Sequence, residues 1–367
     1  MHQLALPLLI GLIAVALAFD FLNGLHDAAN SIATVVGTRL ISPVGAVAFA
    51  AFFNFAAYFL ALQWPELHKV ADTIAKGLID KDLITPAVVF GALVGAMFWN
   101  VVTWLKGIPS SSSHALVGGI VGAGIAHAGF GSIQWTGLNK TLIAIVLSPV
   151  LGLLLTMAIM LATSWLGVRA SARGSERTFR GLHLVSAGAY SLGHGLNDAQ
   201  KTMGIIAVLL YSTGHLTTFY VPHWVALSCY VAIGLGTLTG GWRIIETMGT
   251  RITKLNQHQG FSASAGGSIM LFAASYLGIP VSTTHTITGC VIGAGAARRA
   301  SAVRWGVAGN VMIAWVITIP ASATVGALFY WLITADLPHF GFAALIIVAL
   351  AVAARAWRRN RVQPRGV

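Results

Sequence analysis

The chain has 367 residues, of which 56% are hydrophobic and only 9% are charged, and its mean hydropathy is +0.80. Soluble globular proteins carry about 25% charged residues, so this composition excludes an ordinary soluble domain. The net charge of +12 lies mainly in short loops between apolar segments and in the C-terminal tail. Such a distribution is a membrane-topology signal, and we expect no nucleic-acid partner.

The first half of the chain contains five apolar segments, each long enough to enter or cross a bilayer. They span residues 3–36, 44–63, 85–105, 109–127 and 140–167. A transmembrane helix needs about 20 mostly apolar residues, so the pattern predicts an all-α polytopic membrane protein. The N-terminus lacks a basic stretch and a small-residue cleavage site, which favours a retained helix over a signal peptide.

Asp27 lies near the middle of the first segment, which we expect to be a helix broken near Asn23 and Gly24. A carboxylate at bilayer depth costs ~2.5 kcal/mol or more, and it persists when it faces a cavity or a partner. Unwound carbonyls beside it, together with the side chains of Asn23, His26 and Asn30, predict a site for a hard cation or a proton. The ordinary alternative is a structural aspartate that bonds a neighbouring helix.

A run of serines opens the fourth segment directly after Pro109. Ser111, Ser112 and Ser113 are followed by His114, a pattern that is typical of a helix start. A helix N-terminus offers free N–H groups and a positive dipole end, and hydroxyls add donors, so we expect an oxyanion site here. The ordinary alternative is that these hydroxyls only cap the helix or bond the preceding turn.

The second half of the chain repeats these motifs in one constant register. Gly107-Ile-Pro-Ser-Ser-Ser-Ser-His114 matches Gly278-Ile-Pro-Val-Ser-Thr-Thr-His285, and Gly24-Leu-His-Asp27 matches Gly195-Leu-Asn-Asp198. The equivalent candidates in the second half are therefore Asp198, Asn197, Ser282, Thr283, Thr284 and His285. The chain is a tandem duplication, and a symmetric pair of helix starts suits a tetrahedral oxyanion.

An odd number of segments per unit predicts that the second copy enters the membrane from the opposite face. We divide the chain into a first inverted repeat, a basic cytoplasmic linker, a second inverted repeat, and an extra C-terminal helix with a basic tail. These parts span 1–167, 168–180, 181–335 and 336–367. The basic loops and tail indicate a cytoplasmic C-terminus and an outside N-terminus.

Segments 85–127 and 262–297 are either full two-span hairpins or re-entrant hairpins with tips inside the membrane. We favour re-entrant hairpins because their tips must meet the two aspartates to form one site. The same register pairs Asn30 with Lys201, Ala29 with Gln200 and Asn23 with His194. We expect Lys201 to neutralise the anion or pair with Asp198, with a position at the membrane rim as the alternative, and we count Gln200 among the phosphate-binding candidates.

His114 and His285 are candidates for hydrogen bonding the anion or moving a proton, with plain bonding between helices as the alternative.

These motifs resemble those of the inorganic phosphate transporter (PiT) family, and the resemblance covers essentially the whole chain. It rests on Gly24-Leu-His-Asp-Ala-Ala-Asn-Ser31, on Gly195 to Gly204, and on both Gly-Ile-Pro-hydroxyl-His segments. The resemblance implies an inverted-repeat transporter of the bacterial inner membrane, phosphate as substrate, Na⁺ or H⁺ as coupling ion, and a homodimer. It assigns phosphate contacts to Ser111–Ser113 and Ser282–Thr284, and it aligns Asp27, Asn30 and Asp198 with the family's Asn-Asp motifs.

One departure from the family pattern concerns the coupling ion. Many sodium-coupled members have Asn-Asp in both motifs, whereas this chain has His26-Asp27 in the first and Gln200-Lys201 after the second. This combination resembles the bacterial low-affinity, proton-coupled branch, which takes phosphate partly as a neutral metal–phosphate complex. We therefore favour H⁺ over Na⁺, keep Na⁺ at Asp27 and Asp198 as the alternative, and expect no cofactor.

Three rival functions remain open at this stage. A sulfate permease of the same family would use a similar hydroxyl-lined site. An intramembrane hydrolase is the rival from another class, because Ser, His and Asp occur at depth. The duplicated Ser/His set, with Ser replaced by Thr in places, favours binding over a single catalytic centre. A channel would use similar segments, but we expect a symporter with alternating access, and no enzyme.

Overall fold

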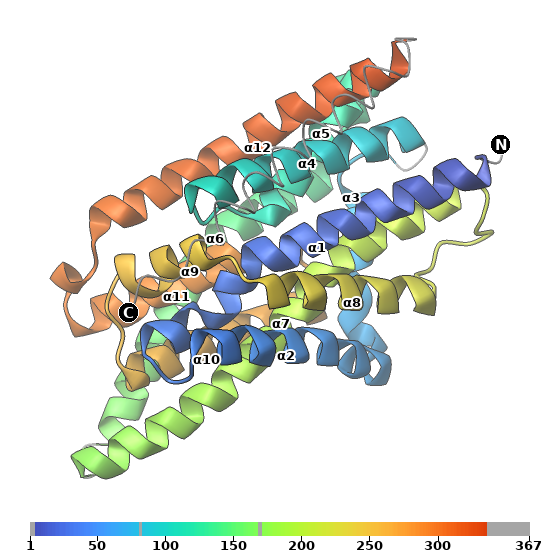
Figure 1. The fold of residues 1–367 in the computed structure, drawn as a ribbon. Coiled ribbons are helices and arrows are strands. Elements are labelled where there is room, and N and C mark those ends of the chain that lie inside the picture. Colours follow the sequence, from blue (N-terminus) through green and yellow to red (C-terminus); the bar gives the residue numbers. More distant parts are fainter. Residues whose placement is uncertain (1–3, 81–82, 168–170, 336–367) are drawn as a thin grey trace.

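The structure is a computed structural model that describes residues 4–80, 83–167 and 171–335 (Figure 1). The described residues form twelve α-helices, so the expected all-α class is confirmed. The first half contains α1 (Leu6–Gly37), α2 (Pro43–Gln63), α3 (Lys69–Gly77), α4 (Pro86–Lys106), α5 (Ser112–Ala128) and α6 (Trp135–Leu166). The second half contains α7 (Ala172–Ser212), α8 (His223–Thr239), α9 (Trp242–Glu246), α10 (Gln257–Leu277), α11 (Thr283–Arg298) and α12 (Trp305–Thr334).

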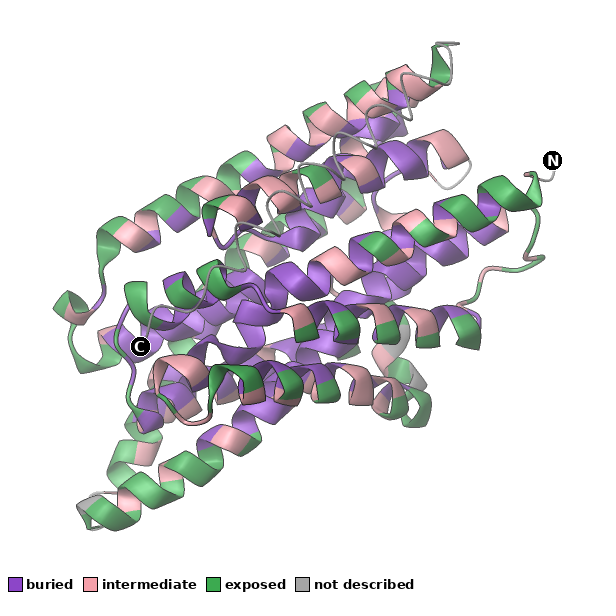
Figure 2. Ribbon diagram, in the orientation of Figure 1, coloured by how far each residue is buried: buried purple, intermediate pink, exposed green. Residues whose placement is uncertain are grey.

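Five of the described helices are long and apolar enough to cross a membrane: α1, α2, α4, α6 and α12. A sixth span results if α8 and the helical segment after it, bent by 70°, count as one. Large apolar side chains face outward, including Val146, Leu166 and Val316 on α6 and α12, whereas the interior is buried (Figure 2). This outward apolar surface suits a lipid environment. The C-terminal helix that we expected within 336–367 lies outside the described residues.

The expected break near Asn23 and Gly24 is wrong, because α1 is continuous through these residues. A Cβ atom at Gly24 would come within 2.2 Å of the backbone oxygen of Ile233 in α8. At the equivalent Gly195 in α7, it would come within 2.5 Å of the backbone oxygen of Asn54 in α2. The two glycines therefore permit close helix crossings, as small residues do in membrane bundles, and do not free backbone carbonyls.

The basic linker that we expected at 168–180 is mostly helical. The helix α7 begins at Ala172, and Oγ of Ser171 accepts a hydrogen bond from the backbone N–H of Gly174 at 3.2 Å. Arg173, Arg177 and Arg180 are exposed on its first turns. These arginines still mark one end of the bundle, but they lie on the first turns of α7 and not in a loop.

The two halves of the chain interpenetrate. Each of the two hydrophobic clusters of the interior contains buried residues from both halves. The helix α5 of the first repeat packs on α12 of the second, and α11 packs on α6. Gly118 and Gly289 make these contacts close, since a Cβ atom would lie 2.4 Å from the backbone oxygen of Ile319 and 2.1 Å from that of Pro149. The equivalent helices α1 and α7 run in opposite directions in Figure 1, as an inverted duplication requires.

Each repeat contains a helical hairpin with the same turn. The helices α4 and α10 both end at a glycine with positive φ, 65° at Gly107 and 68° at Gly278. Glycine adopts this left-handed conformation without the steric penalty of a side chain. A proline follows two residues later, and the return helices α5 and α11 then begin. The tips of both hairpins contact buried residues of α1 and α7, since Ser112 bonds Asp27 and Thr283 bonds Asp198.

Candidate functional site

The site is built first from two capped helix starts. Oγ of Ser111 accepts a hydrogen bond from the backbone N–H of His114 at 3.2 Å, and Oγ of Ser282 accepts one from His285 at 3.1 Å. These two predicted phosphate ligands therefore act as N-caps in the structure. The next two hydroxyl residues of each helix, Ser112 and Ser113 or Thr283 and Thr284, are buried and face the centre of the bundle.

Asp27 from α1 receives hydroxyl groups from both hairpins. Ser112 donates to Oδ2 of Asp27 at 2.7 Å, and Thr284 donates to Oδ1 at 3.4 Å. Nδ1 of His26 lies 2.8 Å from Oδ1. The carboxylate is 1% exposed, so these groups take the place of water around it.

Asp198 from α7 has the equivalent environment with different partners. Thr283 donates to Oδ2 of Asp198 at 3.1 Å, as Ser112 does to Asp27. Nζ of Lys201 donates to Oδ1 at 2.5 Å, and Nε2 of His194 lies 3.3 Å from Oδ2. This carboxylate is fully buried and paired with a buried ammonium group.

Two further side chains link the two halves of the chain across the site. Asn30 on α1 donates to the hydroxyls of Thr283 and Thr284 at 3.3 and 2.9 Å. Lys201, its counterpart on α7, donates to Oγ of Ser113 at 2.5 Å and to the backbone oxygen of Val281 at 3.0 Å. The hairpin of each repeat is therefore held by a side chain of the other repeat, and the two tips meet at one place.

His194 is a site residue that the sequence interpretation missed. One ligand atom each from Asp27, His194 and Asp198 lie within 4.8 Å of one another, an arrangement that can hold a cation. The sequence showed His194 only as a mismatch with Asn23. Its place one turn before Asp198 on a helix was the signal, since residues four apart share a helix face.

The two predicted histidines His114 and His285 also meet at the hairpins. Their ring centroids are 4.1 Å apart at an interplanar angle of 82°. His285 also stacks on Trp315 of α12, with centroids 3.6 Å apart. The histidines therefore form a buried aromatic group at the third position of the two helix starts, and the structure brings them together as the duplication predicts.

The structure does not bring every candidate to the two carboxylates. Nε2 of Gln200 donates to the backbone oxygen of Leu67, and its Oε1 accepts from the N–H of Val70, so it anchors the loop before α3. Asn197 donates to Oγ of Ser275 and to the backbone oxygen of Ile279, both at 3.4 Å, and braces the end of α10.

Asn23 makes no hydrogen bond to either carboxylate among the described residues, and its Oδ1 is buried without a partner. Asp20, one turn earlier on α1, is also fully buried, and its counterpart in the second half of the chain is Ser191.

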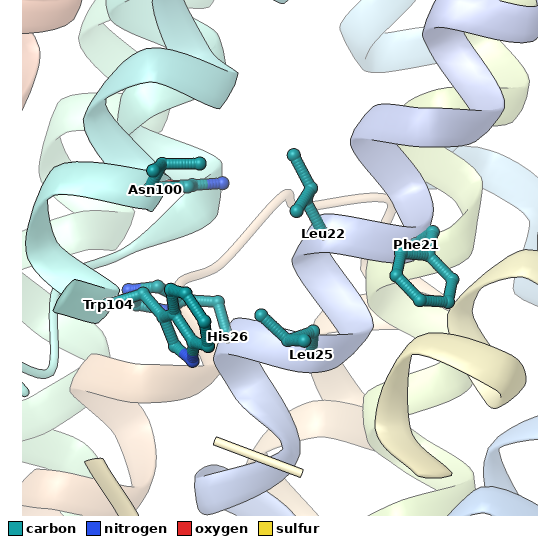
Figure 3. A pocket seen from close by; sticks show the side chains of 7 residues that line it. Phe21, Leu22, Leu25, His26, Asn100 and Trp104 are labelled. Atoms are coloured by element: carbon teal, nitrogen blue, oxygen red, sulfur yellow. The ribbon is translucent and has the colours of Figure 1, made fainter. Parts of the chain in front are cut away.

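A small cavity of about 110 Å³ adjoins His26 between α1 and α4 (Figure 3). The side chains of Leu22, Leu25, Asn100 and Trp104 line it together with His26. His26 is 1% exposed, and its Nε2 lies 3.1 Å from Oγ1 of Thr103 while its Nδ1 contacts Asp27. The ring therefore touches the cavity, Thr103 and Asp27 at once.

Ser110, His26 and Asp27 are connected in the order of a serine hydrolase triad. Oγ of Ser110 is 3.4 Å from Nε2 of His26, whose Nδ1 contacts Asp27. The hydroxyl of Ser110, however, donates to Oγ1 of Thr103 at 2.8 Å, and Ser110 is fully buried. A nucleophile needs its proton directed at the base, so this network positions His26 and does not activate a serine.

Comparisons with known proteins agree with one another. Residues 23–326 match the phosphate transporter family. A "probable low-affinity inorganic phosphate transporter" of Rhizobium meliloti is 63% identical over 330 residues, covering 89% of this chain and 97% of the relative. A protein of Mycobacterium tuberculosis with the same name is 41% identical, covering 99% of this chain and 86% of the relative. A solved structure named "the sodium-dependent phosphate transporter" has a TM-score of 0.79 and 26% identity, covering 90% of this chain and 100% of that one.

Proposed function

The chain belongs to the phosphate transporter family, and we propose that it imports inorganic phosphate across the bacterial cytoplasmic membrane together with a cation. That it is a multi-pass membrane phosphate transporter follows from the family, from its close relatives and from its apolar helices. The observation that carries the proposal of cation-coupled uptake is that the hydroxyl-bearing N-termini of two helices meet two buried carboxylates. A purely structural contact between helices would not need two buried carboxylates.

Phosphate would bind between the N-termini of α5 and α11. The first backbone N–H groups of each helix have no acceptor within the helix, and the helix dipole favours an anion there. The hydroxyls of Ser112, Ser113, Thr283 and Thr284 lie in the same first turns. In the structure Ser112 and Thr283 donate to the carboxylates, so a phosphate oxygen competes with Asp27 and Asp198 for these donors.

This competition supplies a reason for obligatory coupling. A buried carboxylate repels an approaching phosphate strongly in a low-dielectric interior. A cation or proton bound at Asp27 removes this repulsion and weakens the hold of the carboxylate on Ser112, whose hydroxyl then turns to phosphate. Phosphate and cation therefore bind more tightly together than apart, which is the requirement for symport.

We propose H⁺ as the coupling ion. Its support is His26, which contacts both the cavity and Asp27 and can pass a proton between them. Na⁺ is the alternative, because the solved relative is named as sodium-dependent. The oxygen atoms around Asp27 are ligands that Na⁺ also accepts.

We propose that part of the phosphate is transported as a neutral metal–phosphate complex. Asp27, His194 and Asp198 can bind a divalent ion that enters with phosphate as cargo. Phosphate is favoured over sulfate for a different reason. Phosphate at neutral pH carries P–OH groups that donate to carboxylates, and sulfate carries none, so Asp27 and Asp198 select the protonated oxyanion.

Transport would follow alternating access, with one hairpin opening inward while the other closes. The basic first turns of α7 and the basic residues near the end of α11 support a cytoplasmic position for these ends and an outside N-terminus. We also propose that the protein forms a homodimer, as the family resemblance implies.

Radiolabelled phosphate uptake into proteoliposomes tests these statements. With an inward pH gradient and no Na⁺, we expect phosphate to accumulate above equilibrium, and a protonophore to abolish this accumulation. Excess sulfate should leave the uptake unchanged, and a chelator of divalent ions should reduce it. Accumulation driven only by a Na⁺ gradient would overturn proton coupling, and equilibration without accumulation would indicate a channel.

A further inference from the structure

We infer that Lys201 is a tethered cation: its ammonium group permanently occupies one of two pseudo-equivalent cation positions, and only the position at Asp27 takes an exchangeable cation. The inference rests on the proposed cation-coupled uptake of phosphate and deepens it. It limits how many coupling cations these two positions exchange in each cycle.

The surroundings of the Lys201 ammonium group are those of a bound cation. Its three oxygen partners are Oδ1 of Asp198, Oγ of Ser113 and the backbone oxygen of Val281, at 2.5, 2.5 and 3.0 Å. A carboxylate, a hydroxyl and a backbone carbonyl form the kind of oxygen set that hard cations prefer. Lys201 is 2% exposed, so solvent does not solvate the charge in their place.

The same contacts argue against Lys201 as a direct phosphate ligand. An ammonium group has three N–H donors, and the three oxygen partners use all of them. A phosphate ion would have to displace Asp198, Ser113 or Val281 to gain a bond from Lys201. The positive charge still lowers the repulsion that Asp198 exerts on the anion, which is the effect expected of a bound coupling cation.

The equivalent position in the first repeat keeps the oxygen ligands but lacks the charge. Asn30 replaces Lys201, and Thr284 replaces Ser113 as the hydroxyl from the opposite hairpin. Oδ1 of Asn30 is buried and has no hydrogen-bond partner among the residues that the structure describes. It points to a missing ligand beside Asp27.

The groups around the exchangeable position are few. On its own helix Asp27 faces His26, the hairpin of the first repeat contributes Ser112, and the hairpin of the second contributes Thr284. His194 and the carboxylate of Asp198, both on α7, lie close to Asp27 as well. Within the described part of the chain, none of these carries a permanent positive charge, unlike the ammonium group at Asp198.

The decisive variant is Lys201→Asn, which converts the second position to the side chain found at the first. We expect its phosphate uptake at low Na⁺ and fixed pH to fall at least about tenfold, as loss of a coupled cation does. Raising Na⁺ should restore it, because the emptied position then binds a free cation. The variant should therefore depend on Na⁺, whereas the proton-coupled wild type does not.

Two matched variants separate this effect from a simple loss of packing. Lys201→Met removes the charge and supplies no oxygen ligand, so its uptake should stay low at every Na⁺ concentration. Asn30→Lys places a second ammonium group at the mirror position, and its phosphate binding should lose the dependence on pH that the proton-coupled wild type shows. A Lys201→Asn protein with the cation dependence of wild type would overturn the inference.

A readout that needs no transport keeps the inference distinct from the proposed function. In detergent, NaCl but not choline chloride should raise the melting temperature of Lys201→Asn more than that of wild type. If wild type imports no phosphate yet this shift occurs, the proposed function fails and the tethered cation stands. If uptake is normal but Lys201→Asn gains no response to Na⁺ and Asn30→Lys keeps its dependence on pH, the tethered cation fails and the proposed function stands.

Discussion

The two halves of the site share one plan and differ in how their carboxylates are neutralised. Ser112 donates to Asp27 and Thr283 donates to Asp198, which preserves the symmetry of the duplication. Asp198 has the fixed ammonium group of Lys201, whereas Asp27 has the titratable ring of His26. The difference teaches that the hydroxyl donors keep the symmetry of the two motifs, whereas the group beside each carboxylate does not.

The largest expected effect separates the two carboxylates by stability. Asp198→Asn leaves the ammonium group of Lys201 buried without its carboxylate, which costs about 3–5 kcal/mol when one partner of a buried pair is removed. Asp27→Asn keeps a hydrogen-bond acceptor for Ser112 and leaves no fixed charge unpaired. We expect both variants to lose concentrative uptake on the order of 100-fold, a factor that corresponds to about 2.7 kcal/mol.

Thermal unfolding in detergent, measured beside uptake, tests this contrast. Only Asp198→Asn should melt at a clearly lower temperature, and the double variant Asp198→Asn with Lys201→Asn should recover the stability but not the uptake. Equal melting temperatures for Asp27→Asn and Asp198→Asn would show that the two carboxylates are not held differently.

The next effect concerns the helix crossings that carry the two carboxylates. Gly24→Ala and Gly195→Ala each force a Cβ atom to within 2.2 or 2.5 Å of a backbone oxygen, so the helices must move apart. Overpacking of this kind typically costs about 1–3 kcal/mol. Gly11→Ala is the matched control, since no described atom lies within 4 Å of its Cβ position. Unfolding in denaturant should rank Gly11→Ala as at least as stable as wild type, and equal losses in all three would contradict the crossing role.

An effect of similar size is expected from the hydroxyls that reach the carboxylates. Ser112→Ala and Thr283→Val each remove one hydrogen bond to a charged group, worth about 1.5–3 kcal/mol. If these hydroxyls also bind phosphate, the concentration for half-maximal uptake should rise roughly tenfold, which corresponds to 1.4 kcal/mol. The capping variants Ser111→Ala and Ser282→Ala should instead lower stability by about 1 kcal/mol and leave this concentration nearly unchanged. A reversed pattern would assign phosphate contact to the caps.

The smallest effect concerns the braces that hold the hairpin turns. Thr247 donates to the backbone oxygen of Gly107 at 3.0 Å, and Thr73 donates to that of Gly278 at 2.7 Å. Replacing either by Val removes one neutral hydrogen bond, worth about 1 kcal/mol, so uptake should change by no more than about fivefold. Thr250→Val, whose hydroxyl bonds only its own helix at Glu246, is the control and should change nothing. A complete loss in Thr73→Val alone would mean that the second hairpin depends on its brace.

Much of the site could be predicted from local patterns. The turn Gly-Ile-Pro-hydroxyl-His specifies a left-handed glycine, a proline near the helix start and a capping hydroxyl, and all three occur at Gly107 to Ser111 and at Gly278 to Ser282. Asp27 and Asp198 stood out because buried carboxylates are costly and therefore rare in apolar helices. The constant register of the duplication then paired the motifs of the two halves, although the sequence does not give the distance between them.

Other features depended on which helix lies next to which. Gly24 suggested a helix break in isolation, but its reason is the backbone of α8, which only the packed structure supplies. Gln200 lies beside Lys201 in the chain yet points to the loop at Leu67, because adjacent residues on a helix face different neighbours. His194 gained its role from the approach of Asp27, a residue of the other repeat.

By itself, the sequence determined the all-α class, the lengths of the apolar segments, the two capped hairpin turns and their duplication. These features follow from hydrophobic length and from backbone preferences that act over a few residues. Only the tertiary structure decided that Asn30 reaches Thr284 and that Lys201 reaches Ser113, so that each half is completed by the other. The reason is physical: a buried polar group must find a partner, and that partner is selected by the packing of distant helices.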